Sequence, residues 1–155
     1  MAHNPVNHPL RPLYRALGVL AGAYLVLFGI LGAIMTADEG LFGNGEDRVL
    51  GQQTNLFWSI VCVLLGAIVL VAVVIGRNAD TEVDKYVGWG LLVVGSYELA
   101  VIRTDANFLN FSISTVVVTY LLGLILIMAA YYSVIGPKEQ AGPPRQARER
   151  QSQSA

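Results

Sequence analysis

The segment that decides the fold is "LFWSIVCVLLGAIVLVAVVIG", residues 56–76, which contains no charged side chain. The uncharged stretch around it begins at Val49 and runs to Gly76. At a rise of 1.5 Å per residue, about 20 helical residues cross the roughly 30 Å of hydrocarbon in a bilayer. The segment therefore predicts a transmembrane helix.

The composition of the 155-residue chain agrees, because 54% of its residues are hydrophobic and 14% are charged, against roughly 25% charged in a soluble domain. A soluble domain of this size leaves too much surface exposed to hide so many apolar side chains. Uncharged stretches also occupy residues 16–37 and 106–137. A shorter apolar stretch, residues 86–102, contains one charged residue, Glu98. We expect an all-α membrane protein, a compact antiparallel bundle of four transmembrane helices at about residues 17–37, 56–76, 86–102 and 114–135.

Basic residues are unevenly distributed between the two ends of this predicted bundle. Eight lie in the N-terminal lead-in, in the link between the second and third spans or in the C-terminal tail, and two lie in the other loops. Because cytoplasmic segments are enriched in Lys and Arg, we predict a multi-pass protein of the plasma (inner) membrane with both termini cytoplasmic. Residues 1–16 are then a cytoplasmic lead-in, 17–136 the transmembrane domain, and 137–155 a basic tail with a composition typical of disorder.

Side chains suited to catalysis are sparse. Cys62 is the single cysteine and lies within the second span, which excludes an intrachain disulfide and favours a packing role. His3 and His8 have no third ligand nearby, and the four carboxylates within residues 38–47 lack the spacing of an EF-hand loop. The chain has no nucleotide-binding glycine loop and no HExxH motif, and its net charge of −1 gives no indication of nucleic-acid binding. The sequence predicts no enzyme activity, no cofactor and no metal site.

Small residues recur on one side of several predicted helices. Lipid is as apolar as leucine, so membrane helices associate through small side chains that let their backbones approach. In the fourth span, Thr115 and Thr119 share a face with glycine and alanine residues. The predicted helix-packing glycines are Gly18, Gly22, Gly29, Gly66, Gly88, Gly95 and Gly123.

Glu98 is the candidate functional residue, because a carboxylate inside a membrane span is costly and often marks function. It lies about 6 Å inside the membrane boundary if the third helix ends at Ile102, and near the middle if the helix continues to Leu109. The charges that follow Ile102 favour the shallow position. We expect a structural role through hydrogen bonds or an ion pair, with proton handling and partner contact as alternatives. The candidate partners of the carboxylate are Thr115, Thr119, Arg103 and Arg48.

The loops before the second and fourth spans resemble each other. "RVLGQQTN", residues 48–55, and "RTDANFLN", residues 103–110, each end in Asn seven residues after an Arg. "LLGAI", residues 64–68, and "LLGLI", residues 121–125, then follow at similar depth. Two helical hairpins in parallel orientation would produce this pattern, with or without an internal duplication.

Four further stretches carry a family resemblance: "NPVNHPLRPLYRALGVLAGAYLVLFGILG" (4–32), "GLFGNGEDRVLGQQTN" (40–55), "VIGRN" (74–78) and "IRTDANFLNFSIS" (102–114). With them the chain resembles an actinobacterial, mycobacterium-like family of small four-helix integral membrane proteins described only as a domain of unknown function. The resemblance covers about residues 4–137. It implies an inner-membrane protein and supplies no activity and no functional residues.

Two functional hypotheses follow. The first is a non-catalytic accessory, stabilising or assembly subunit of a larger inner-membrane complex, because packing faces are abundant and catalytic groups are not. The second is a small dimeric transporter or channel that uses Glu98. The expected partners are the lipid bilayer and either another membrane protein or further copies of this chain.

Overall fold

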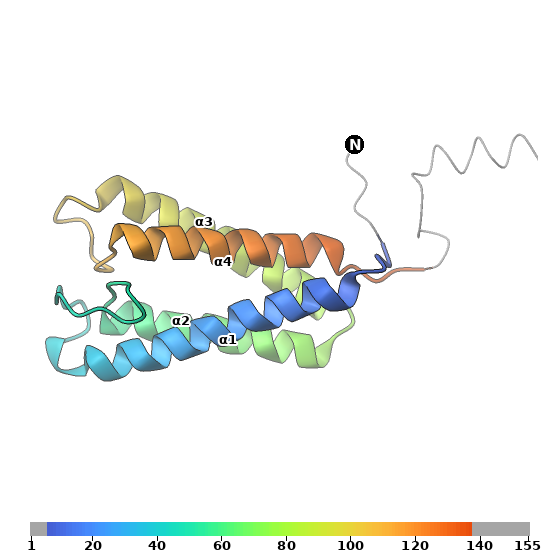
Figure 1. Ribbon diagram of the computed structural model, residues 1–155, viewed down its shortest axis with the longest axis horizontal. Helices are drawn as coiled ribbons and strands as arrows, with labels where there is room; N and C mark the ends of the chain where they lie inside the picture. Colours follow the sequence, from blue (N-terminus) through green and yellow to red (C-terminus); the bar gives the residue numbers. More distant parts are fainter. Residues whose placement is uncertain (1–5, 138–155) are drawn as a thin grey trace, which may run out of the picture.

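The computed structural model describes residues 6–137, and within them every regular element is helical (Figure 1). No strand occurs in this part of the chain; a single isolated β-bridge joins Val49 and Gln52. Along the chain, the four long helices are α1 (Arg11–Met35), α2 (Leu56–Ile75), α3 (Ala79–Val101) and α4 (Ile113–Tyr132), and a short 3-10 helix, η1 (Ala37–Glu39), follows α1.

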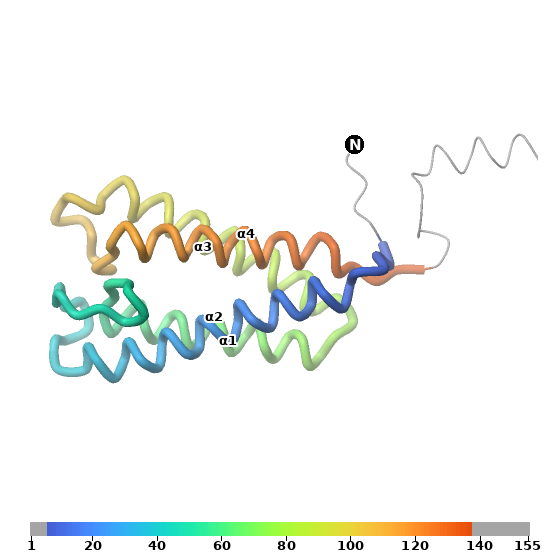
Figure 2. Tube along the Cα trace, viewed as in Figure 1, coloured from blue at the N-terminus to red at the C-terminus, as the bar shows by residue number. Residues whose placement is uncertain are grey.

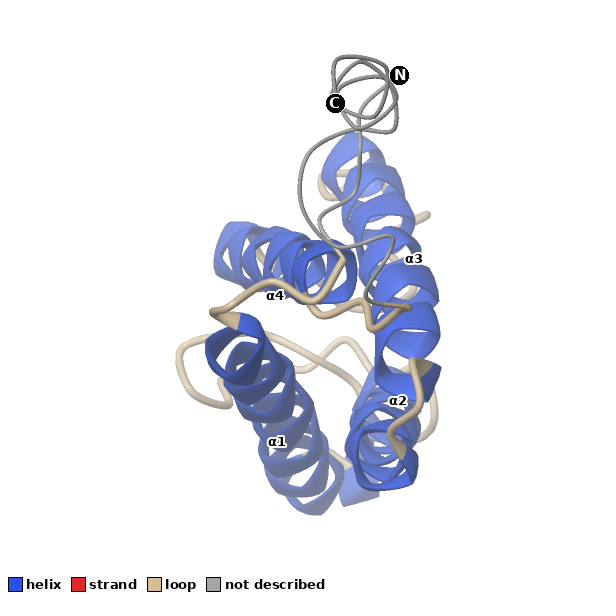
Figure 3. Cartoon of the chain, turned by 90° about the vertical axis from the view of Figure 1, so that its right-hand side faces the viewer, coloured by secondary structure: helices blue, strands red, loops and turns tan. Residues whose placement is uncertain are grey.

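The helices form two antiparallel hairpins, since α1 packs chiefly on α2 and α3 packs chiefly on α4 (Figures 1 and 3). The tube in Figure 2 shows both long loops at one end of the bundle, here termed the loop end, residues 36–55 and 102–112. The start of α1, the link from α2 to α3 and the end of α4 lie at the opposite end, here termed the terminal end, residues 6–10, 76–78 and 133–137.

Three of the four helices, α1, α2 and α4, are long and apolar enough to cross a membrane. The expected transmembrane character is therefore supported for these three helices, whereas α3 is less clearly transmembrane. The reason lies in its sequence: four charged residues occupy its first two turns, and a fifth, Glu98, lies near its end. The all-helical, membrane-type architecture expected from the sequence is confirmed at this level.

Helix ends follow the local chemistry of the chain. Asn55 caps α2, because its side-chain oxygen accepts a hydrogen bond from the Trp58 amide, and Ser112 caps α4 with a capping box completed by Thr115. Gly76 ends α2 with a φ of 65°, a left-handed conformation that glycine adopts without a steric penalty. Asn78, also left-handed, is the N-cap residue of α3.

Two helices begin earlier than the uncharged stretches suggested. α1 begins at Arg11, six residues before position 17, and α3 begins at Ala79, seven residues before position 86. Among the charged residues in these first turns, Arg11 and Arg15 of α1 pair with Asp80 of α3, and Lys85 pairs with Glu82 within α3. α3 ends at Val101 and so does not continue to Leu109. The predicted C-terminal tail, except Pro137, and residues 1–5 of the lead-in lie outside the described residues.

Each hairpin crosses at a pair of glycines. A Cβ on Gly66 would lie 2.5 Å from the Gly22 carbonyl oxygen, and one on Gly88 would lie 2.8 Å from the carbonyl oxygen of Gly123. Gly66 and Gly123 each follow their own helix N-cap by eleven residues (55 to 66 and 112 to 123). The two hairpins are therefore built on the same crossing, in which hydrogen replaces a side chain so that the backbones touch.

Candidate functional site

Helix α3 carries three buried carboxylates on the side that faces the bundle. Asp80, Asp84 and Glu98 are 1%, 2% and 0% exposed. Asp80 and Asp84 lie one turn apart at the terminal end, and Glu98 lies about 21 Å further along the helix. A buried carboxylate is stable only with a cation, hydrogen bonds or a proton, so the surroundings of each one decide what it can do.

Asp80 is paired with two arginines of α1. Arg15 Nε lies 2.8 Å from Asp80 Oδ2, and Arg11 Nη2 lies 3.7 Å from the same oxygen. The Arg15 contact is an ion pair whose alignment falls short of a hydrogen bond. The other carboxylate oxygen accepts a hydrogen bond from the Thr81 amide at 3.1 Å. Asp80 is thus a charge-paired structural residue that joins α1 to α3.

The same two arginines also bind the ends of the remaining helices. Arg15 Nη2 donates to the Val73 carbonyl of α2 at 2.7 Å, and Arg11 Nε donates to the Ser133 carbonyl after α4 at 2.8 Å. The last carbonyls of a helix have no partner within the helix and attract cations, whereas an acidic residue suits a helix start. Two arginines therefore satisfy the C-terminal ends of α2 and α4 and the N-terminal end of α3 together.

Asp84 occupies the space left by a glycine of the neighbouring hairpin. A Cβ on Gly18 would lie 2.8 Å from Asp84 Oδ2 and 3.7 Å from the Ala129 Cβ. Asp84 Oδ1 is buried and has no hydrogen-bond partner among the described residues. The carboxylate is therefore enclosed where the two hairpins meet, and it depends on a glycine at position 18.

Glu98 is enclosed near the other end of α3. Neither carboxylate oxygen makes a hydrogen bond within the described residues; the Leu109 backbone lies nearby but forms no hydrogen bond of normal geometry. Leu109 belongs to the loop that follows α3 and is itself buried. Glu98 thus lies close to that loop near the loop end.

None of the four residues predicted as partners of Glu98 bonds to its carboxylate. The Thr115 hydroxyl donates to the Gln53 carbonyl at 2.7 Å, which ties α4 to the preceding loop of the other hairpin. Thr119 is buried, and its methyl carbon would lie 3.6 Å from a Cβ placed on Gly95. Arg103 is exposed and has no ion pair in the described part of the chain, as is the case for Arg48. The functional role assigned to Glu98 from sequence stays a prediction.

The two echoed loops bind each other through the asparagines in which they end. Asn55 Nδ2 donates to the Phe108 carbonyl at 2.7 Å, and Asn110 Nδ2 donates to the Thr54 carbonyl at 3.1 Å and to the Gly45 carbonyl at 2.9 Å. Each asparagine therefore reaches from its own hairpin to the loop of the other. This reciprocal pair holds the loop end closed, as the arginine–aspartate cluster holds the terminal end.

Sequence reasoning missed the arginine–aspartate cluster, although a signal for it exists. Arg11 and Arg15 are four residues apart, and so are Asp80 and Asp84, which places each pair on one helix face. Opposite charges on two such faces at the same end of a bundle indicate pairing. The predicted packing glycines, by contrast, are each buried: Gly18, Gly22, Gly29, Gly66, Gly88, Gly95 and Gly123.

Within residues 6–137 no group of three or more His, Cys, Asp or Glu side chains is arranged to hold a metal ion. Cys62 is free and buried in α2.

The fold and its buried charges define a class, a small four-helix protein with membrane-type helices. The chain belongs to the family described as "Domain of unknown function (DUF4383)", which matches residues 15–132. The matched region runs from the first turns of α1 to the end of α4 and so includes both hairpins. No curated protein and no solved structure matches the chain.

Proposed function

We propose that this protein is a non-catalytic integral membrane protein that acts as an accessory, stabilising or assembly subunit of a larger inner-membrane complex. The observation that carries the proposal is the use of polar side chains at both ends of the bundle. The arginine–aspartate cluster and the reciprocal asparagines join one hairpin to the other. Side chains committed to such contacts serve rigidity and leave the lateral faces as the means of acting on other proteins.

The lateral faces suit this role in a membrane. The exposed side chains along α1, α2 and α4 include many large apolar residues, and the small residues that allow close approach are used inside the bundle. An apolar outer surface contacts lipid or the apolar helices of another membrane protein equally well. A rigid body with such a surface can stabilise a neighbouring subunit without chemistry of its own.

The proposed orientation has both termini in the cytoplasm, as expected for an inner-membrane protein of an actinobacterium. It rests on eight basic residues at the terminal end and its tails against two at the loop end. A cytoplasm-active reporter fused to the C-terminus should give a signal, and a periplasm-active reporter there should give none. The opposite pattern would reverse the orientation or change the number of spans.

The decisive experiment for the accessory role is purification of the tagged full chain from its own membranes in mild detergent. Mass spectrometry should identify one or more membrane proteins at a fixed ratio to the chain, absent from untagged membranes treated in the same way. Recovery of the chain alone, at monomer mass in several gentle detergents, would contradict the proposal.

A second candidate, a small dimeric transporter or channel, is favoured by one observation. Glu98 is fully buried and neither of its oxygens is hydrogen-bonded within the described residues, a state that suits a residue that binds and releases a proton. Proton or substrate flux into vesicles that contain the purified chain would support this function if Glu98→Gln abolishes it. The matched control is Glu82→Gln, which changes an exposed glutamate of the same helix.

A further inference from the structure

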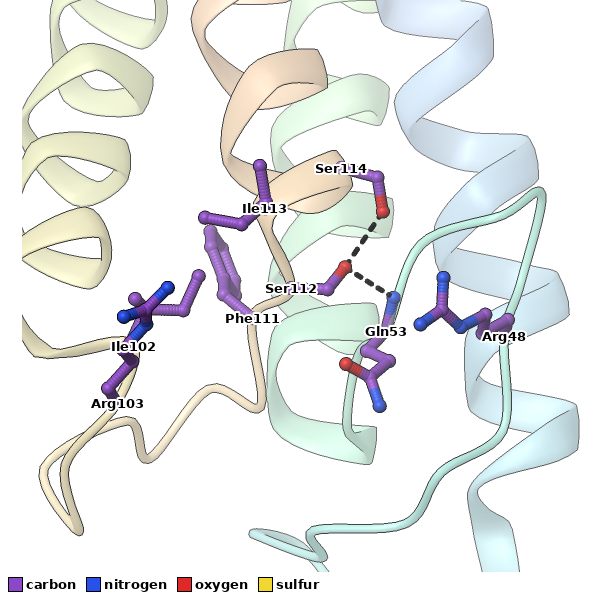
Figure 4. Close-up of a pocket in the computed structure, with 8 residues that line it drawn as sticks. All are labelled: Arg48, Gln53, Ile102, Arg103, Phe111, Ser112, Ile113 and Ser114. Atoms are coloured by element: carbon purple, nitrogen blue, oxygen red, sulfur yellow. Dashed lines mark hydrogen bonds between the residues drawn. The ribbon is translucent and has the colours of Figure 1, made fainter.

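An open cavity of about 450 Å³ lies at the loop end between the two hairpins. Its size falls within the range of about 300–1,000 Å³ typical of small-ligand sites. Figure 4 shows Arg48 and Arg103 on opposite sides of it, with Phe111 and Ser112 between them. The residues that line the cavity come from both long loops and from the start of α4.

The two arginines are the basic residues of the loop end, which also contains five carboxylates, Asp38, Glu39, Glu46, Asp47 and Asp105. Neither forms an ion pair within residues 6–137. Acidic residues occur beside them in the sequence, Asp47 and Asp105 among them, yet none lines the cavity. The cavity therefore has two cationic walls and no anionic one, which attracts an anion from solution or from a membrane surface.

The floor of the cavity is held in place by hydrogen bonds. The Gln53 amide donates to the Ser112 hydroxyl at 3.3 Å, and the Ser112 and Ser114 hydroxyls are 2.8 Å apart. Ser114 in turn donates to the Gly51 carbonyl at 2.8 Å. These bonds fix the start of α4, whose N-terminal end adds a partial positive charge. The segments that lie between the two arginines are therefore held in fixed positions.

The remaining lining is apolar, with Ile102, Phe111 and Ile113. Ile113 begins α4, one of the helices apolar enough to cross a membrane, so the cavity lies where a membrane surface would meet that helix. Phosphate groups of lipids occupy this level, and arginine binds phosphate through two parallel hydrogen bonds.

From this arrangement we propose that the cavity between Arg48 and Arg103 binds a phosphate group, carried by an anionic phospholipid headgroup or free in solution. The arginines supply the charge, and the apolar lining receives the glycerol and upper acyl chain when the phosphate belongs to a lipid. This proposal does not depend on the accessory role and holds for a transporter as well.

The test uses the purified full chain in mild detergent, titrated with phosphatidylglycerol, with phosphatidylcholine or with inorganic phosphate and followed by native mass spectrometry. Loss of one arginine should weaken phosphatidylglycerol binding about fivefold, and Arg48→Gln with Arg103→Gln should weaken it roughly 25-fold, from the usual contribution of a basic residue near anionic lipid. Arg77→Gln is the control, because Arg77 is exposed at the terminal end, away from the cavity.

The arms of the titration identify the source of the phosphate. Binding of phosphatidylglycerol that depends on the two arginines assigns a lipid headgroup; arginine-dependent binding of inorganic phosphate without lipid binding assigns free phosphate. Equal binding by wild type and the double variant would overturn the site, as would an equal loss in Arg77→Gln. Both arginines are exposed, so unchanged thermal unfolding of the variants should confirm that the fold is intact.

Discussion

Each hairpin crosses at a pair of glycines in the same way, but the two hairpins differ in how closely their helices pack between that crossing and the loop end. Counted from the crossing glycines, Gly29 of α1 corresponds to Gly95 of α3, and Gly32 corresponds to Glu98. A Cβ on Gly29 would collide with the Ser59 backbone, whereas one on Gly95 would meet nothing closer than 3.6 Å. The first hairpin is therefore closely packed as far as the loop end, and the second separates after its crossing.

This difference explains where the carboxylates are. In the first hairpin, a Cβ at position 32 would force the Ser59 side chain to shift, so glycine suits this position. In the second, the wider separation leaves room for the Glu98 side chain. At the other end, Gly18 corresponds to Asp84, and these two equivalent residues meet where the hairpins touch. Two positions that are glycines in the first hairpin, Gly18 and Gly32, thus correspond to buried acids in the second, Asp84 and Glu98.

The largest expected effect is a difference in stability between alanine substitutions at two corresponding glycines, Gly29 and Gly95. Gly29→Ala should destabilise the protein by about 1–3 kcal/mol, because the added methyl group forces two backbones apart. Gly95→Ala, the matched substitution in the second hairpin, should be neutral or stabilise by up to about 1 kcal/mol. Thermal unfolding of both variants in the same detergent measures the contrast. Equal losses at the two positions would show that the hairpins are packed alike.

A somewhat smaller effect is expected at the terminal end. Arg15→Gln removes the nearer partner of buried Asp80 and should cost about 2 kcal/mol, less than a fully buried pair because Arg15 is 30% exposed and Arg11 stays close by. Arg77→Gln, at an exposed position of the same end, should cost less than about 0.5 kcal/mol. Chemical denaturation of both variants measures their free energies of unfolding. Similar losses in the two variants would show that the arginine–aspartate cluster does not stabilise the protein.

At the loop end, the reciprocal asparagines should show a smaller effect. Asn55→Ser keeps a good helix cap but loses the hydrogen bond to Phe108, so a cost of about 1 kcal/mol is expected. Amide hydrogen exchange should rise in residues 102–112, in the other hairpin, as well as near the substitution. An increase confined to residues 48–58 would mean that the loops do not hold each other.

The apolar segments and their small residues were sufficient to predict four helices, their order and the glycines between them. Helix starts were harder, because Arg11 and Asp80 resemble the edge of a span until the two are known to pair with each other. The loop echo indicated two hairpins, yet it did not reveal that Asn55 and Asn110 bind across them. Pairing between distant segments depends on their proximity in three dimensions, and the periodicity of residues along one helix does not reveal that proximity.

The surroundings of Glu98 show the same limit. The shared small face of α3 and α4 suggested hydroxyl partners from Thr115 or Thr119, but separation of these helices toward the loop end leaves Thr115 bonded to the Gln53 carbonyl. A sequence pattern gives the face on which a residue lies; the distance across that face is set by every contact along both helices.

The most direct test of the central claim, that the protein acts as a rigid accessory subunit without chemistry at Glu98, is the paired measurement of stability and partner recovery for Glu98→Leu. Removing an unpaired buried charge relieves its desolvation, so the variant should unfold at the same temperature as wild type or higher. It should also recover the same membrane proteins from mild detergent. A stable Glu98→Leu protein that has lost its partners or its effect on the cell would contradict the account and make Glu98 the functional site.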